Sequence, residues 1–172
     1  MTLSEKLRRI RVVILDIDGV LTDGRVGYDG ERKIKFFNYR DGHWIKLAIR
    51  AGLLVGALSG AHSPANAQRA TELGFSFLRE GVKDKLDGFE KLVAELGVSP
   101  EECLYMGDDV MDMPPMRRVG VAVAVRDALP ELDEVADWRT EIPGGHGAVC
   151  EVMHRLLAAQ GKLDAVLEKY RR

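Results

Sequence analysis

The feature that most constrains the fold is a repeated alternation of short apolar runs with amphipathic segments. The first run, residues 12–15, reads Val-Val-Ile-Leu and ends at a carboxylate, as is typical of a strand buried on both faces. Runs of the same character occupy residues 53–58, 75–78, 103–106 and 121–125. We predict a strand in each of them.

The segments between these runs carry helical patterns. Apolar residues from Leu86 to Leu96 recur at the spacing of one buried helix face, and Gly97 is a suitable helix end. Residues 65–73 form a second pattern, with Ser63 and Pro64 as start signals and Gly74 as the stop. Strands alternating with helices predict an α/β fold, a doubly wound parallel sheet that binds ligands outside the carboxyl ends of its strands.

Residues 25–39 depart from this pattern. Val26 and Tyr28 precede Asp29-Gly30, and Ile34 and Phe36 follow, which predicts a β-hairpin inserted after the first strand. The hairpin is expected to expose apolar residues such as Phe36 and Phe37. We predict one domain over residues 1–172, without a cap domain, and a charged tail over 161–172 that is partly helical or loose.

Composition narrows the class of protein. The chain of 172 residues has a net charge of -2, which argues against a nucleic-acid surface as its main function. No apolar run approaches the roughly 20 residues of a membrane-spanning helix, and the charged segment 1–10 lacks the apolar core of a signal peptide. Cys103 and Cys150 are expected to be reduced, largely buried thiols, so we predict a cytoplasmic protein.

An acidic motif follows the first apolar run directly. Asp16 and Asp18 stand two residues apart in Asp-Ile-Asp-Gly, and neighbouring carboxylates repel each other when they are desolvated. A divalent cation would relieve that repulsion, and Mg²⁺ prefers carboxylate oxygens together with water and phosphate. The motif therefore predicts a magnesium site at this strand end.

A second acidic cluster follows the run 103–106. Asp108 would complete the metal shell with Asp16 and the Asp18 carbonyl, and Asp112 would orient that shell from outside. Asp109 has three open roles: metal ligand, orienting group or helix start.

Two smaller signals fit the same strand edge. Ser59 ends the run 53–58 before Gly60, so its hydroxyl and nearby amides could hold a phosphate oxygen. Lys85 opens a predicted helix, where an ammonium is poorly placed for the helix dipole unless it faces an anion. Lys83 is the competing lysine.

These pieces, in this order, resemble the haloacid dehalogenase-type phosphatases over nearly the whole chain. The resemblance implies that Asp16 attacks phosphorus and forms an aspartyl-phosphate. It implies that Asp18 is the acid and then the base, and that Mg²⁺ and Lys85 neutralise the phosphoryl oxygens.

A narrower resemblance rests on residues 37–42, Phe-Asn-Tyr-Arg-Asp-Gly, and on 144–149, Gly-Gly-His-Gly-Ala-Val. Both segments are similar to those of the 3-deoxy-D-manno-octulosonate 8-phosphate phosphatase family, which acts on a sugar-acid phosphate in lipopolysaccharide biosynthesis. The resemblance implies a homotetramer in which hairpins close neighbouring sites. The substrate-binding positions that it implies, besides Lys85, are Asn38, Arg40, Asp41, Gly42, Lys46 and Arg69. A guanidinium at Arg40 or Arg69 could grip the carboxylate of a sugar acid.

Two positions depart from the family pattern. Ala61 and His146 stand where the family usually has arginine, and either change could shift specificity.

Three rival functions stay open. The runner-up activity is that of a nonulosonate 9-phosphate phosphatase. A phosphoacceptor receiver module is disfavoured because no aspartate ends the run 75–78, and an inactive binding module is disfavoured by the retained catalytic carboxylates.

Overall fold

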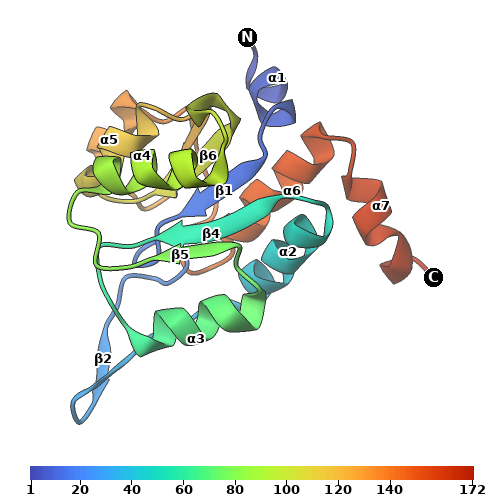
Figure 1. Ribbon diagram of the computed structural model, residues 1–172. Helices are drawn as coiled ribbons and strands as arrows, with labels where there is room; N and C mark the ends of the chain where they lie inside the picture. The colour runs from blue at the N-terminus through green and yellow to red at the C-terminus, as the bar shows by residue number, and fades with distance from the viewer.

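Six parallel strands form one sheet through the middle of the computed structural model, which describes residues 1–172 (Figure 1). The sheet has the order β5-β4-β1-β6-β7-β8. Its strands are β1 (Val12–Leu15), β4 (Leu54–Leu58), β5 (Phe77–Arg79), β6 (Cys103–Gly107), β7 (Val121–Ala124) and β8 (Trp138–Arg139). The chain adds strands on one side of β1 and then returns to add strands on the other, so the predicted doubly wound α/β fold is confirmed.

Helices cover both faces of this sheet. They are α1 (Leu3–Arg8), α2 (Tyr39–Arg50), α3 (Pro64–Leu73), α4 (Lys85–Leu96), α5 (Met113–Met116), α6 (Ala148–Ala159) and α7 (Leu163–Leu167). Short 3₁₀ turns occupy Pro100–Glu102, Val110–Asp112, Pro130–Glu134 and Glu168–Tyr170. No helix is both long enough and apolar enough to cross a bilayer.

The core consists of two apolar clusters, one on each side of the sheet. Val13 and Leu15 of β1 pack into the cluster shared with α1, α2 and α6, whereas Val12 and Ile14 pack into the cluster beneath α4 and α5. Because β1 is buried on both faces, every residue of its run is apolar. The predicted helices end as expected, with Gly74 and Gly97 in the left-handed conformation at φ 74° and 62°.

The hairpin is shorter than predicted. Its strands are β2 (Gly27–Asp29) and β3 (Arg32–Ile34), and it extends away from the sheet (Figure 1). The predicted boundary at residue 39 is wrong, because Tyr39 already belongs to α2. The Asn38 side chain caps that helix by accepting hydrogen bonds from the backbone nitrogens of Arg40 and Asp41, at 2.8 and 3.2 Å.

The two phenylalanines that follow the hairpin differ. Phe36 is 71% exposed, as predicted. The prediction for Phe37 is wrong: its ring is half-buried against the larger core cluster and lies 5.6 Å from the guanidinium carbon of Arg69. A cation over the ring face and the apolar contact both stabilise Phe37 in this position.

Five elements of the structure were not predicted: the helices α1, α2, α5 and α6, and the two-residue strand β8. The tail is helical through α7 and then turns, which agrees with a partly helical tail. Both cysteines are free thiols; Cys103 is buried and Cys150 is half-buried.

Candidate active site

Three strand ends bring the predicted catalytic residues together. Asp16 follows β1, Ser59 follows β4 and Asp108 follows β6, and β1 lies between the other two strands in the sheet. An open cavity of about 430 Å³ lies at this edge. Its lining residues are Asp16, Asp18, Ser59, Gly60, Ala61, Lys83, Lys85, Asp108, Asp109 and Met111.

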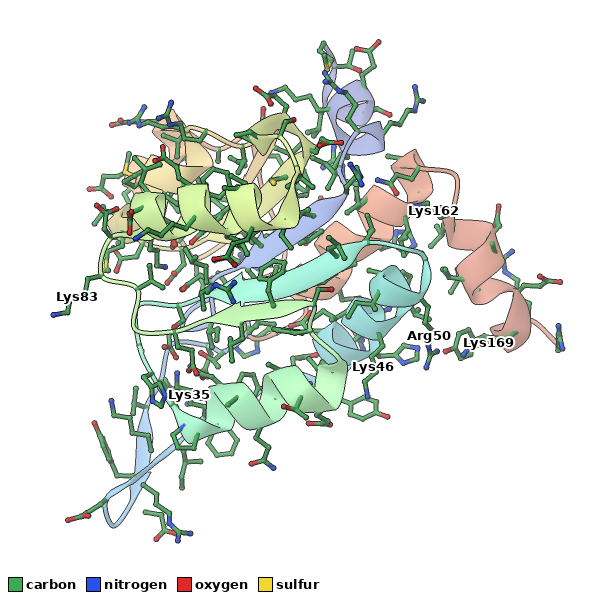
Figure 2. All side chains as sticks on the ribbon, in the orientation of Figure 1. Lys35, Lys46, Arg50, Lys83, Lys162 and Lys169 are labelled. Carbon is green, nitrogen blue, oxygen red and sulfur yellow. The ribbon has the colours of Figure 1, made fainter.

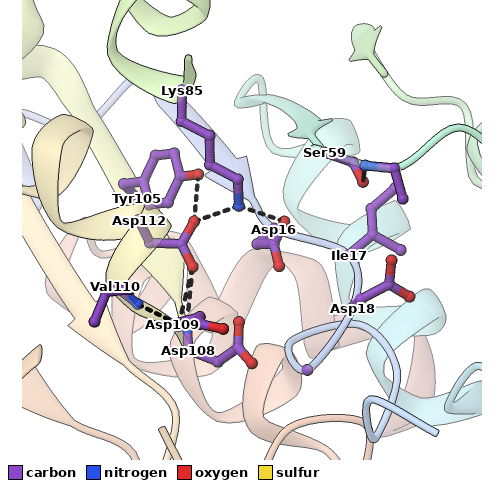
Figure 3. Close-up of polar contacts among 12 residues, drawn as sticks. Asp16, Ile17, Asp18, Ser59, Lys85, Tyr105, Asp108, Asp109, Val110 and Asp112 are labelled. Carbon is purple, nitrogen blue, oxygen red and sulfur yellow. Dashed lines mark hydrogen bonds and ion pairs between the residues drawn. The ribbon is translucent and has the colours of Figure 1, made fainter. Parts of the chain in front are cut away.

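Lys85 is the buried cation of this site. As the first residue of α4, it places its amine 2.8 Å from Asp16 Oδ1 and 2.5 Å from Asp112 Oδ1 (Figure 3). Burial alone would lower the pKa of Lys85, but the two carboxylates outweigh it and raise that pKa. Lys85 is therefore a permanent positive charge against Asp16. Lys83 lines the same cavity, is exposed and forms no ion pair.

Asp112 connects Lys85 to the loop that follows β6. Its Oδ1 accepts a hydrogen bond from the Tyr105 hydroxyl at 2.8 Å, and its Oδ2 accepts from the backbone nitrogens of Asp108 and Asp109 at 3.0 and 3.3 Å. The side chain is fully buried. Asp112 thus holds the loop that carries Asp108, which agrees with the predicted orienting role.

Tyr105 was not identified from the sequence as part of this network. A tyrosine inside an otherwise apolar buried strand is the available signal, because a buried phenol usually requires a hydrogen-bond partner. For Asp109, the structure shows the contact expected of a helix start, and the metal-ligand and orienting roles stay predictions. Its side chain accepts from the Val110 nitrogen at 2.6 Å and caps the turn Val110–Asp112.

The electrostatics of the cluster fit a divalent cation. Carboxylate oxygens of Asp16, Asp108 and Asp112 lie within 4.8 Å of one another. Burial, followed by the charge of Asp112, raises the pKa of Asp16 to about 7, and burial together with the Asp16 charge raises that of Asp108 to about 8. Three crowded carboxylates face only one lysine, so the cluster has an excess of negative charge. Hard oxygen ligands of this kind are those that Mg²⁺ binds.

Asp18 is held apart from this cluster. Its carboxylate accepts from the Lys35 amine, at 2.7 Å from Oδ1 and 2.8 Å from Oδ2. Figure 3 shows Asp18 on the opposite side of Asp16 from Asp112. Lys35 was not predicted as a site residue, and a lysine after a hairpin strand carries no sequence signal for such a contact.

Two glycine positions allow the acidic loops to approach each other. Gly19 has φ 91°, and a side chain there would collide with the Asp108 carboxylate, whose Oδ2 would lie 1.9 Å from the added carbon. At Gly144 an added carbon would lie 1.7 Å from the Gly19 carbonyl oxygen. The late Gly-Gly-His-Gly segment therefore packs directly against the loop of Asp16 and Asp18.

Ser59 is 1% exposed, and its hydroxyl oxygen accepts a hydrogen bond from the Ala61 nitrogen at 3.2 Å. That contact fixes the hydroxyl at the cavity wall and leaves its proton available to an incoming anion.

Apart from Lys85, the predicted substrate-binding residues do not line this cavity in a single subunit. Gly42, Lys46 and Arg69 line a separate small cavity of about 70 Å³. Arg69 is committed to the chain itself, since Nη2 donates to the Asn38 carbonyl oxygen and Nη1 pairs with Glu72, both at 3.1 Å.

Asp41 and Gly42 are buried, so neither has access to a ligand in one subunit. Asp41 Oδ1 accepts from the Cys150 nitrogen at 2.7 Å and so links α2 to the start of α6. Burial raises the pKa of Asp41 to about 6. Arg40 is exposed, and Asn38 serves as the helix cap described above.

The order of strands and acids places the molecule in a class, the haloacid dehalogenase-like hydrolases. A family model of that description matches residues 63–152. The 3-deoxy-D-manno-octulosonate 8-phosphate phosphatase KdsC of Escherichia coli K12 is 45% identical over 161 residues, which are 92% of this chain and 85% of the relative. The chain belongs to the 3-deoxy-D-manno-octulosonate 8-phosphate phosphatase family.

Solved structures agree with this assignment. The 3-deoxy-D-manno-octulosonate 8-phosphate phosphatase from Yersinia pestis superposes with a TM-score of 0.91 at 40% identity, over 94% of this chain and 88% of that one. The enzyme from Moraxella catarrhalis, in complex with magnesium ion, phosphate ion and KDO, superposes with a TM-score of 0.94 at 32% identity, over 97% of both chains. Membership in this family of phosphatases disfavours the receiver module as an alternative.

Proposed function

We propose that this protein is a magnesium-dependent phosphatase that hydrolyses 3-deoxy-D-manno-octulosonate 8-phosphate to the free sugar acid and phosphate. The observation that carries the proposal is the buried Asp16–Lys85 pair beside Asp108, at the base of an open cavity. An acid, a lysine and a second acid in this geometry suit transfer of a phosphoryl group to a carboxylate.

In the first step Asp16 is the nucleophile. A carboxylate oxygen of Asp16 forms a bond to phosphorus as the bond to the sugar oxygen breaks, and the electron pair of that bond goes to the leaving oxygen. Asp18 donates a proton to this oxygen, so the sugar leaves as an alcohol. Lys85, held at 2.8 Å from Asp16, orients the nucleophile and offsets the charge that it delivers.

In the second step water hydrolyses the aspartyl-phosphate. Asp18, now a carboxylate, takes a proton from the water, whose oxygen forms a new bond to phosphorus while the bond to Asp16 breaks. Phosphate leaves and Asp16 regains its charge. The Ser59 hydroxyl, fixed at the cavity wall, donates a hydrogen bond to a phosphoryl oxygen.

The metal would be held by the carboxylates of Asp16 and Asp108 and by the backbone carbonyl of Asp18. When bound, Mg²⁺ supplies positive charge against the phosphoryl oxygens. The raised pKa values of Asp16 and Asp108 support this role, because they reflect burial and repulsion that a cation would relieve.

The active form is proposed to be a homotetramer. Exposed apolar side chains gather on and beside the hairpin, and their exposed fractions are large for a free surface: Val26 48%, Tyr28 67%, Ile34 39%, Phe36 71% and Tyr39 88%. A neighbouring hairpin could also close the open cavity against water. In such an assembly a second subunit could bring Arg40 or Lys46 to a site that they do not reach in their own chain. The free thiols of Cys103 and Cys150 support a cytoplasmic location.

The decisive experiment measures kcat/KM of the purified protein, with and without Mg²⁺, on octulosonate 8-phosphate, a nonulosonate 9-phosphate and a hexose phosphate. We expect the highest value on the 8-phosphate. A clear preference for the nonulosonate would make the runner-up activity correct. Equal rates on all three would remove the sugar-acid assignment while leaving a phosphatase.

Ala61 provides a sharper version of the same measurement. It lines the cavity mouth after Ser59 and Gly60, where an arginine could form one charge-assisted hydrogen bond to the sugar acid. The Ala61→Arg variant is expected to lower KM for the 8-phosphate by about tenfold, with little change for the hexose phosphate. An equal change on both substrates would place the sugar carboxylate elsewhere.

A further inference from the structure

The Lys35 side chain is buried although the segment that carries it is exposed. Lys35 follows β3 directly, and its neighbours Ile34 and Phe36 are 39% and 71% exposed. The Lys35 side chain is only 3% exposed. Burying an ammonium is costly unless a partner compensates it, so this position requires a specific contact.

That contact is the carboxylate of Asp18. The Lys35 amine meets both oxygens, at 2.7 and 2.8 Å, and makes no other hydrogen bond or ion pair in the structure. The Asp18 side chain stays 35% exposed and lines the cavity. Lys35 therefore holds Asp18 from the side of the hairpin while the carboxylate still faces the substrate space.

A comparison with Lys83 shows that this burial is specific. Figure 2 shows Lys35 where the hairpin joins the domain, whereas Lys83 extends from its loop into solvent. Lys83 forms no ion pair and Lys85 is committed to Asp16 and Asp112. Of the lysines near the cavity, only Lys35 contacts Asp18.

We propose that Lys35 is a positioning residue for proton transfer. It keeps the Asp18 carboxylate out of the cluster formed by Asp16, Asp108 and Asp112, which would otherwise attract it once a cation is bound. The bond also ties the base of the hairpin to the group that moves the proton. This inference rests on the acid/base role of Asp18 in the proposed function.

The chemistry gives the inference a distinctive signature. An alkyl phosphate needs Asp18 in both steps, first to protonate the alkoxide and then to deprotonate water. p-Nitrophenyl phosphate has a leaving group that departs without a proton, so only its second step needs Asp18. Displacement of Asp18 should therefore slow turnover of the alkyl ester. With the aryl ester as substrate, the aspartyl-phosphate should accumulate on the enzyme.

The test compares Lys35→Met, which keeps an unbranched apolar stem and removes the charge, with Lys35→Arg and with Lys33→Met. Lys33 lies in β3 and is exposed and unpaired, so Lys33→Met is the matched control. We expect Lys35→Met to lower kcat on an alkyl phosphate by about 10- to 100-fold, which only reaches the lower end of the ~10²–10⁴-fold contribution of an acid/base group because Asp18 itself is retained, with little change in KM. On the aryl ester it should release a burst of one nitrophenolate per site. Lys35→Arg should recover part of the loss and Lys33→Met should match the unmodified protein.

A double variant separates this inference from the proposed function. If Lys35 acts through Asp18, adding Lys35→Met to Asp18→Asn causes no further loss. The role of Lys35 is overturned if Asp18→Asn is impaired while folded Lys35→Met keeps full activity on the alkyl phosphate. It is also overturned if the losses of the two single variants multiply in the double variant. If Asp18→Asn itself keeps full activity, the proposed mechanism fails first. Should Lys35→Met not fold, Lys35→Arg and Lys35→Gln carry the same comparison.

Discussion

The carboxyl edge of the sheet and the hairpin differ in the burial of their side chains and in the contacts that these side chains make. At the sheet edge, charged side chains are buried and cross-linked: Asp16, Lys85 and Asp112 are each at most 6% exposed and bond to one another. The hairpin buries little, and its two strands pair only with each other. Buried ion pairs are therefore concentrated where phosphoryl transfer is proposed, and the exposed apolar surface lies where a neighbouring molecule could bind.

The difference suggests that, under the proposed function, catalysis and assembly would use separate parts of this chain. At the edge, Asp112 accepts from Lys85, Tyr105 and two backbone nitrogens, and Lys85 also pairs with Asp16, so a single change there should alter chemistry or stability strongly. The hairpin has few partners in its own subunit, so a change there should leave the subunit folded. The following predictions test that division, beginning with the largest expected effect.

Asp16→Asn should abolish turnover without unfolding the protein. An amide cannot attack phosphorus, so we expect kcat to fall by on the order of 10⁴-fold or more. The melting temperature should stay the same or rise, because one of three mutually repelling carboxylates is removed. Asp87→Asn is the matched control, since Asp87 is an exposed acid on α4 paired with Lys91. Near-normal turnover of folded Asp16→Asn would assign the nucleophile elsewhere.

Chelation should abolish activity, and Mg²⁺ affinity should fall as pH falls. With pKa values of about 7 for Asp16 and about 8 for Asp108, protons compete with the cation below pH 8. We expect affinity to drop about tenfold per pH unit while one proton is displaced. Calorimetric titrations in buffers of different ionisation enthalpy measure that proton release. Affinity that is constant from pH 6 to 8 would contradict the assigned carboxylates.

The free energy of unfolding of the metal-free protein should fall as pH rises, which is opposite to the trend in Mg²⁺ affinity. Both carboxyl groups bind protons more tightly in the folded chain than in the unfolded one, where aspartate titrates near pH ~3.9. Their contribution to stability is therefore complete below the unfolded value and is lost as pH rises through 7 to 8. Urea unfolding at several pH values, with and without Mg²⁺, distinguishes the two trends.

Asp112→Asn should destabilise the fold more than Tyr105→Phe. Replacing Asp112 weakens a fully buried ion pair with Lys85 and its hydrogen bonds to the loop, at a cost of about 3 kcal/mol. Tyr105→Phe removes only one hydrogen bond, at a cost of about 1 kcal/mol. Urea midpoints at pH 7 give both values. Equal costs would mean that Asp112 does not anchor the loop.

Phe36→Asp should have the smallest effect on the subunit and a visible effect on assembly. Phe36 is 71% exposed, so its replacement should change the unfolding free energy by no more than about 0.5 kcal/mol. A charge on this surface should shift the protein to smaller species in sedimentation or light scattering. Tyr170→Asp is the control, because it places the same charge on an exposed aromatic residue of the tail, away from the hairpin. If the unmodified protein and the Phe36→Asp variant are both active monomers, the proposed tetramer is contradicted.

Much of the active-site edge could be predicted because its signals are local. Each apolar run forms a strand, and Asp16, Ser59 and the pair Gly107-Asp108 directly follow or end such runs. Parallel strands place their carboxyl ends at one edge of the sheet. That reasoning located Asp16, Ser59 and Asp108 without any knowledge of contacts. The predicted hairpin reached residue 39, whereas β3 ends at Ile34 and the capping bond of Asn38 starts α2 at Tyr39.

The sequence by itself determined five of the six strands of the sheet and the acidic loops that follow β1 and β6, since these depend on periodicity and on residues adjacent in the chain. Only the tertiary structure decided that Asp109 caps a turn while Asp112 binds Lys85, 27 positions away. It likewise decided that Lys35 reaches Asp18 across 17 positions and that Asp41 reaches the Cys150 nitrogen across 109. Pairing between distant charges depends on where the folded backbone places them and on how much water is excluded there, and neither quantity is encoded by local pattern.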